Sequence, residues 1–78
     1  MVIYKIFNAD GSYQNVPRKK TAELETLQKW VGGNIEVADS PVAGTTVYCN
    51  EDGIRLKLPR NPFFKNLLGN VVMEVNQK

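Results

Sequence analysis

The chain has 78 residues, of which 42% are hydrophobic, and its formal net charge is +2 at pH 7. A chain of this length forms one domain, so we assign residues 1–78 to a single domain. A net charge this small is typical of an ordinary soluble protein, and it argues against strong attraction to nucleic acid.

Cysteine and histidine usage restricts the chemistry. Cys49 is the only cysteine, so an internal disulfide is excluded, and without a signal-peptide pattern we expect an intracellular protein. The chain has no histidine, which is the commonest metal ligand and general base. We therefore expect no catalytic residue, no metal and no cofactor, and a protein that is not an enzyme. No apolar run is long enough for a membrane span, so we also expect no membrane association.

The first half of the chain predicts two strands and a helix. Residues 2–7 are rich in β-branched and aromatic side chains, and after a polar turn the chain returns as a short strand that ends at Pro17. A helix is predicted over residues 21–31, with Thr21 as its N-cap and Gly32 in the glycine pair that stops it. Its predicted buried face has helical spacing and consists of Leu24, Leu27, Trp30 and Val31.

The second half predicts five more elements. Residues 34–39 and 45–50 are expected to be strands. Gly53 is expected to take a positive φ in a hairpin turn that leads into a third strand over residues 54–58. In that strand apolar side chains alternate with basic ones, in the order Ile54, Arg55, Leu56, Lys57 and Leu58.

Asn61 and Pro62 have the pattern of an N-cap and the first residue of a second helix, which Gly69 ends. Residues 71–75 predict the last strand. The order β-β-α-β-β-β-α-β indicates an α+β fold, in which two helices cover one face of a mostly antiparallel, or partly mixed, sheet in a small two-layer domain. Strands 2–7 and 71–75 are candidates for the sheet edges, and a free edge recruits a second chain. We therefore expect a monomer, or a homodimer formed through an edge strand.

Two kinds of side chain could form a binding surface. Trp30 belongs either to the core or to a protein-contact patch, if an exposed edge of its ring lies next to Phe63 or Phe64. The alternative surface is basic and consists of Arg55, Lys57, Arg60 and Lys65. With Tyr48 pointing outward it could bind single-stranded nucleic acid weakly, although these cations could equally be solvated. Cys49 lies within an apolar strand and is expected to be structural, because burial makes a thiol inert.

Three segments together resemble an uncharacterised family, domain of unknown function 3846, over residues 24–75. They are residues 27–37 (LQKWVGGNIEV), residues 48–53 with 58–62 (YCNEDG and LPRNP), and residues 68–73 (LGNVVM). The family occurs mostly in phages, mobile elements, bacteria that carry them and large DNA viruses of algae. The resemblance implies a phage or viral accessory protein and no assigned activity.

The shared motifs contain Asn50, Glu51, Gly53 and Asn61, which either mark a common surface or serve only as a hairpin turn and an N-cap. Asn50, Glu51 and Asn61, with Trp30 and Phe63, are our candidate binding surface. We expect a non-enzymatic protein-interaction module that acts on a host or viral protein in the host cytoplasm or nucleus. The alternative is a weak nucleic-acid-binding domain.

Overall fold

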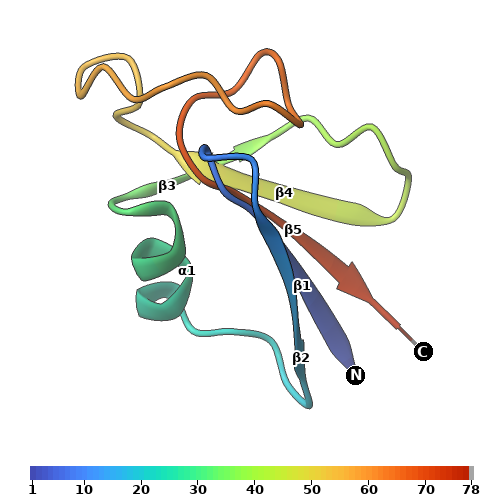
Figure 1. The fold of residues 1–78 in the computed structure, drawn as a ribbon. Coiled ribbons are helices and arrows are strands. Elements are labelled where there is room, and N and C mark those ends of the chain that lie inside the picture. The colour runs from blue at the N-terminus through green and yellow to red at the C-terminus, as the bar shows by residue number, and fades with distance from the viewer. Residues whose placement is uncertain (78) are drawn as a thin grey trace.

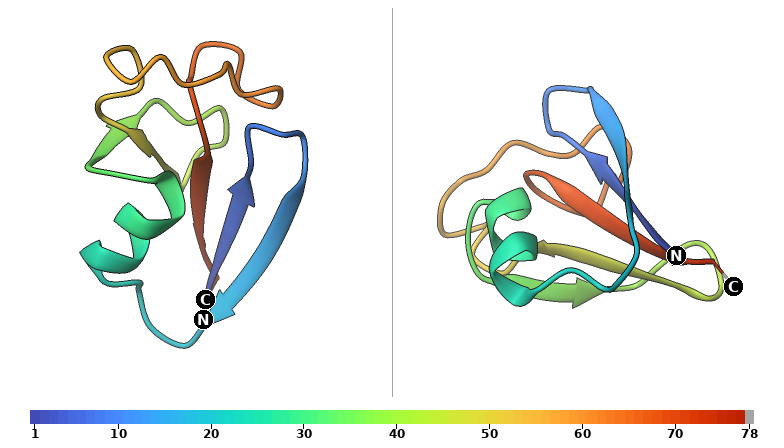
Figure 2. Two further views of the ribbon diagram at one scale, coloured as in Figure 1. Left: turned by 60° about the vertical axis from the view of Figure 1, so that its left-hand side comes forward. Right: turned by 90° about the horizontal axis from the view of Figure 1, so that it is seen from below.

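The computed structural model describes residues 1–77 as a five-stranded antiparallel sheet with one helix against it (Figure 1). The strand order is β2-β1-β5-β4-β3. The elements are β1 (Val2–Phe7), β2 (Tyr13–Arg18), α1 (Leu24–Val31), β3 (Ile35–Ala38), β4 (Thr45–Asn50) and β5 (Val71–Asn76). The two chain ends lie side by side because β1 and β5 pair antiparallel (Figure 2).

Helix α1 covers one face of the sheet (Figures 1 and 2). Side chains alternate between the faces of a strand, so Tyr4 of β1 and Val72 of β5 point toward this helix. Leu27 and Val31 of the helix are buried against them. Full burial of such a side chain stabilises a fold by about 1.5–3 kcal/mol, so these few contacts hold the helix in place.

The opposite face carries a second apolar cluster. Val47 and Val71 are fully buried there, and Cys49 and Met73 are nearly so. The long segment between β4 and β5 arches over one end of the sheet, and its Phe64 packs against this cluster (Figure 2). Each face of the sheet therefore has its own small core.

The helix begins later than predicted. It starts at Leu24, and its N-cap is Glu23, which makes no capping bond through its side chain. Thr21 is not the N-cap, because the next residue, Ala22, donates its N–H to the buried Tyr4 hydroxyl over 2.7 Å and this bond holds the segment against the sheet. The predicted stop is confirmed, since Gly32 has a φ of 82° and donates its N–H to the Gln28 carbonyl.

The predicted fold, with two helices and the order β-β-α-β-β-β-α-β, was wrong. The described chain has one helix and the order β-β-α-β-β-β. No strand forms over residues 54–58, because β4 already pairs with β3 on one side and with β5 on the other. Strand β4, with which residues 54–58 would have to form a hairpin, therefore has no free side. Residues 51–57 fold into successive turns instead, and the positive φ of 55° falls on Lys57 rather than on Gly53.

The predicted second helix is also absent from the described residues. Arg60 and Leu68 form an antiparallel bridge, and the Asn61 N–H donates to the Leu67 carbonyl over 2.9 Å. These bonds hold the two ends of the segment side by side, whereas a helix of seven residues would separate its ends by about 10 Å. The segment is therefore a closed loop.

The edge strands also differ from the prediction. Strands β1 and β5 are both interior, so neither of the predicted edges is free. The edges are β2 and β3, which are the outermost strands on the two sides of the sheet.

Candidate functional site

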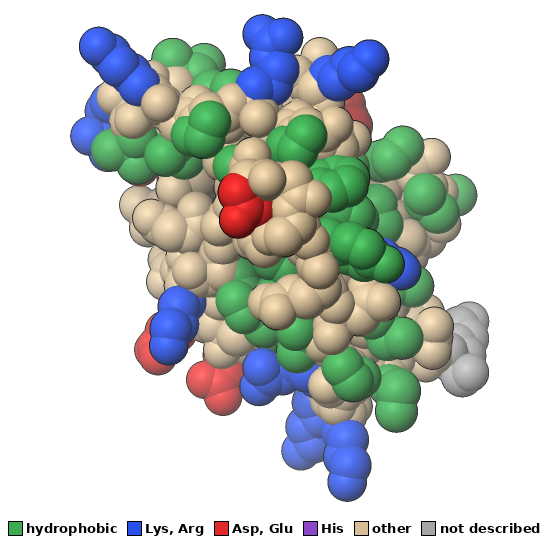
Figure 3. Space-filling model, viewed as in Figure 1, with side chains coloured by type: hydrophobic (Ala, Val, Ile, Leu, Met, Phe, Trp, Pro, Cys, Tyr) green, Lys and Arg blue, Asp and Glu red, His purple; other side chains and the backbone are tan. Residues whose placement is uncertain are grey.

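Hydrophobic side chains are exposed on the surface between two groups of basic side chains, which lie at opposite ends of the molecule in Figure 3. Two large aromatic residues are among the exposed ones. The exposed fraction is 57% for Tyr13 and 45% for Phe63. Exposed aromatic side chains on a small domain commonly mark an interaction surface.

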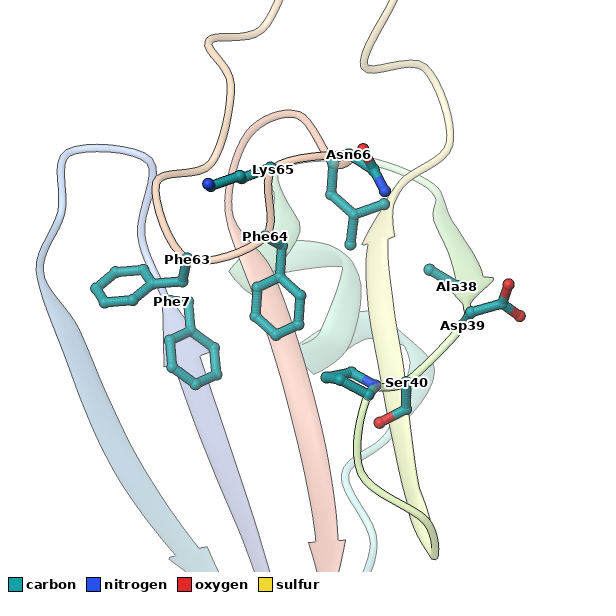
Figure 4. A pocket seen from close by; sticks show the side chains of 10 residues that line it. Phe7, Ala38, Asp39, Ser40, Phe63, Phe64, Lys65 and Asn66 are labelled. Atoms are coloured by element: carbon teal, nitrogen blue, oxygen red, sulfur yellow. The ribbon is translucent and has the colours of Figure 1, made fainter.

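An open groove of about 700 Å³ adjoins these aromatics on the face opposite α1 (Figure 4). Phe7 and Phe63 form one side of the groove, and Phe64 points into it. The other side is residues 38–41, which are the last residue of β3 and the start of the loop after it, and Lys65 lies at the rim. We call this site the aromatic groove, and its lining is Phe7, Ala38, Asp39, Ser40, Pro41, Phe63, Phe64, Lys65, Asn66 and Leu67.

Phe7 is the centre of the aromatic side of the groove. Its ring centroid lies 5.1 Å from that of Phe63, 5.2 Å from that of Phe64 and 5.8 Å from that of Tyr13. Tilted and edge-on contacts at these distances are favourable for aromatic rings. Phe7 belongs to β1 and Tyr13 to β2, where they are directly paired. The sheet therefore fixes two of the four rings.

Asn61 fixes the other two rings. Its side chain is fully buried, and its amide nitrogen donates to the carbonyls of Phe7 and Gly69, both over 2.9 Å. Its side-chain oxygen accepts the N–H groups of Phe63 at 2.8 Å and of Phe64 at 3.2 Å. This is the bonding pattern of an N-cap, but no helix follows. Asn61 supports the aromatic groove from beneath and does not contribute to its surface.

Hydrogen bonds within the loop between β3 and β4 hold residues 38–41 in place. The Ser40 hydroxyl is hydrogen-bonded to the Thr45 hydroxyl, and it donates to the Val42 carbonyl over 3.1 Å. Both sides of the groove are therefore held in place without a ligand.

The other motif residues lie elsewhere. Asn50 is 6% exposed, and its side chain donates to the Val31 carbonyl and accepts the Asp52 N–H. It thereby joins the end of α1 to the end of β4. Glu51 is exposed beside it, in a second cleft of about 410 Å³. Gly53 is buried, and a Cβ there would lie 3.2 Å from the Leu68 side chain.

Trp30 does not join Phe63. Its ring packs against Tyr4 with centroids 5.3 Å apart, on the face that α1 covers. Phe63 packs against Phe7, whose side chain alternates to the opposite face. Of the two alternatives for Trp30, the core is therefore the one that the structure shows, and no patch forms in which Trp30 lies next to Phe63 or Phe64.

The four basic residues of the alternative surface all lie in the segment between β4 and β5. Arg55 pairs with Asp52 at 3.3 Å. Arg60 and Lys65 line the second cleft together with the acids Glu36 and Glu51. Tyr48 does not point outward as expected, because it is half-buried and packs against the core beneath α1.

Four side chains have a shifted pKa, and one of them is Tyr48, whose pKa is raised by burial and by the nearby Glu74. Burial, opposed by the Ala22 N–H and reinforced by Glu74, raises the pKa of Tyr4 to about 12. Burial, with a smaller effect of Glu36, also raises the pKa of the Cys49 thiol, which disfavours the reactive thiolate. The pKa of Asp10 is lowered by its hydrogen bonds with Ser12.

Within residues 1–77, no cluster of three or more His, Cys, Asp or Glu side chains could hold a metal ion.

The comparisons with known proteins identify the family. The family described as Domain of unknown function (DUF3846) matches residues 5–75, which is most of the chain. The chain belongs to this family. The match runs from β1 to β5, so this DUF3846 domain includes both sides of the aromatic groove and Asn61. No curated protein and no solved structure matches the chain significantly.

Sequence reasoning found Phe63 but missed most of this groove in the DUF3846 domain. Phe7 and Tyr13 were assigned only to strands, and residues 38–41 only to a strand end and a loop. A signal for Phe7 was present, since it falls on the opposite face of its strand from Tyr4. The approach of residues 38–41 to Phe64 leaves no sequence pattern.

In residues 1–77, no helix is both long and apolar enough to cross a membrane.

Proposed function

We propose that this DUF3846 domain is a non-enzymatic protein-interaction module of a phage or virus, which binds a host or viral protein inside the host cell through the aromatic groove. The observation that carries the proposal is an open groove with an aromatic side that includes the half-exposed Phe63. Aromatic residues are enriched at protein interfaces and supply much of their binding energy. The phage or viral setting is supported by the resemblance to the family.

The groove also indicates the chemistry of its partner. Phe64 and Leu67 provide an apolar surface for an aromatic or branched aliphatic side chain. Lys65 at the rim makes no ion pair with any residue in 1–77, so it is free to bind a carboxylate. The proposed occupant is a protein segment with an apolar anchor followed closely by an acidic residue.

Selection from a random peptide-display library tests this function. Peptides selected on the wild-type domain should lose at least about tenfold in affinity for Phe63→Ser, because an aromatic anchor commonly contributes more than 1.4 kcal/mol to binding. The matched control is Leu24→Ser, since Leu24 is also about half exposed, at 56%, and belongs to α1. Peptides that bind Phe63→Ser as tightly as the wild type, or the recovery of no binder, would contradict the proposal.

The second candidate function is weak binding of nucleic acid. One specific observation favours it, because four cations occur in the single segment that crosses one end of the sheet. They are Arg55, Lys57, Arg60 and Lys65. A single-stranded oligothymidylate should then bind at low salt, and the affinity should fall steeply as salt rises. Replacement of the four cations with Glu should abolish binding, and absence of binding by the wild type at low salt excludes this function.

A further inference from the structure

The two edges of the sheet are not equivalent. Strand β2 contains Pro17, which lacks an N–H, and this blunts the edge against pairing with another strand. Strand β3 contains no proline, and its four residues are Ile35, Glu36, Val37 and Ala38. Within residues 1–77 it pairs only with β4, and the exposed fraction of Val37 is 64%. The free side of β3 is thus an open site for one more strand.

The same chain contains a segment with the pattern of a strand but no pairing partner. Residues 54–58 alternate apolar and basic side chains, yet they form turns on the surface. The exposed fraction is 86% for Ile54 and 46% for Leu56. Apolar side chains exposed to this extent, in a segment whose local pattern disagrees with its structure, commonly mark a functional surface.

We propose that this protein forms a homodimer in which residues 54–58 of each copy pair with the free edge of β3 in the other. In such a pair, Ile54 and Leu56 would extend the apolar row that contains Val37. Arg55 and Lys57 would then fall on the opposite face, which also carries Glu36. Cross-strand pairs of opposite charge stabilise a sheet, so the side chains match on both faces.

The positions of the two elements allow the exchange to be reciprocal. The segment that leads to residue 54 begins beside β3, because the Glu51 N–H donates to the Asn34 carbonyl over 2.8 Å. The open strand and the unpaired segment therefore lie on the same side of the molecule (Figure 1). A twofold axis can then make both exchanges at once, which gives a closed dimer and not a fibre.

The conformational change is local. Within residues 54–58, the N–H groups of Leu56, Lys57 and Leu58 donate to main-chain carbonyls of the turn. A strand ladder would replace them. Lys57 would also leave its left-handed φ of 55°, a conformation that is unfavourable for a lysine. Asn50 and Asn61 hold the segment on either side and can remain in place.

The mass of the full chain in solution tests the proposal. Light scattering after gel filtration should show an average mass that rises with concentration from 8.8 kDa toward twice that value. Val37→Lys should stay monomeric, because a lysine on an edge strand opposes pairing. The matched control is Val42→Lys, whose site is 51% exposed in the adjacent loop, and it should dimerise like the wild type. The proposal is overturned if the wild type stays monomeric up to about 1 mM, or if Val37→Lys dimerises normally.

A charge exchange checks the pairing itself. Glu36→Lys alone, and the double variant Arg55→Glu with Lys57→Glu alone, should each self-associate at least tenfold more weakly than the wild type. In a mixture of the two variants, both exchanged strand pairs juxtapose opposite charges, one with the signs reversed and one as in the wild type, so heterodimers should form. NMR spectra of each variant establish that it is folded. A mixture that associates no better than its components would show that these charges do not face one another and would overturn the proposed pairing.

Discussion

The side-chain amide of Asn61 donates a hydrogen bond over 2.9 Å to the main-chain carbonyl of Phe7, which lies 54 residues earlier in the chain. This bond joins the loop that carries Phe63 and Phe64 to the end of β1, where Phe7 completes the aromatic side of the groove. The proposed binding surface therefore depends on one buried amide that never reaches the surface.

Replacement of Asn61 should destabilise the protein strongly. Asn61→Ala removes four hydrogen bonds made by the side chain and leaves buried carbonyl and N–H groups without partners. We expect the free energy of unfolding to fall by about 2–4 kcal/mol, measured by urea denaturation. Asn66→Ala, at an exposed site in the same loop, should change it by less than about 0.5 kcal/mol. Equal effects of the two variants would contradict the supporting role of Asn61.

Tyr4 should make the stability depend on pH in the alkaline range. Its pKa is about 12 in the folded protein, against 10.0 for the unperturbed side chain, so the folded state binds the phenolic proton more tightly than the unfolded state. The resulting stabilisation is fully present below pH 10 and is lost as the pH rises toward 12. A difference of two pKa units corresponds to about 2–3 kcal/mol. The free energy of unfolding of Tyr4→Phe, measured by denaturation across this pH range, should lack this pH-dependent component. A pH profile identical to that of the wild type would contradict the prediction.

Gly69 and Gly11 should respond differently to the same substitution. Both have a positive φ, 77° and 95°, so alanine strains the backbone at each by about 1–2 kcal/mol. A Cβ at Gly69 would also lie 2.8 Å from the Leu58 side chain, whereas at Gly11 nothing lies within 4 Å. Gly69→Ala should therefore lower the melting temperature clearly more than Gly11→Ala. Equal changes would mean that Leu58 moves aside at no cost.

Cys49 should be unreactive until the protein unfolds. It is 6% exposed, and its burial both shields the thiol and raises its pKa. A chromogenic disulfide reagent at pH 8 should label the native protein far more slowly than the protein in concentrated denaturant. Rapid labelling of the native protein would show that the second core opens easily.

Local patterns were sufficient where the partner of a segment is close in the chain. The apolar run of residues 2–7 and the turn after it predicted a hairpin, and β1 pairs with β2. Helical spacing located α1, and Gly32 located its end. Leu24 was assigned wrongly to the buried face, because the helix begins there and leaves its side chain 56% exposed.

Patterns failed between β4 and β5, because there the outcome depended on which strands were already paired. Ile54 to Leu58 alternate as a strand should, but both sides of β4 are occupied, by β3 and by β5. Asn61 has the sequence signature of an N-cap and makes the corresponding bonds. It also binds Phe7 and Gly69, and with these bonds the chain forms a loop over the sheet.

Composition and spacing thus determined the early strands, the helix and the buried state of Cys49. Only the tertiary structure decided the sheet order, the edges and the aromatic groove. The physical reason is that strand pairing and ring packing join residues far apart in the chain, and the free energy of such contacts depends on which alternatives the rest of the fold has already excluded.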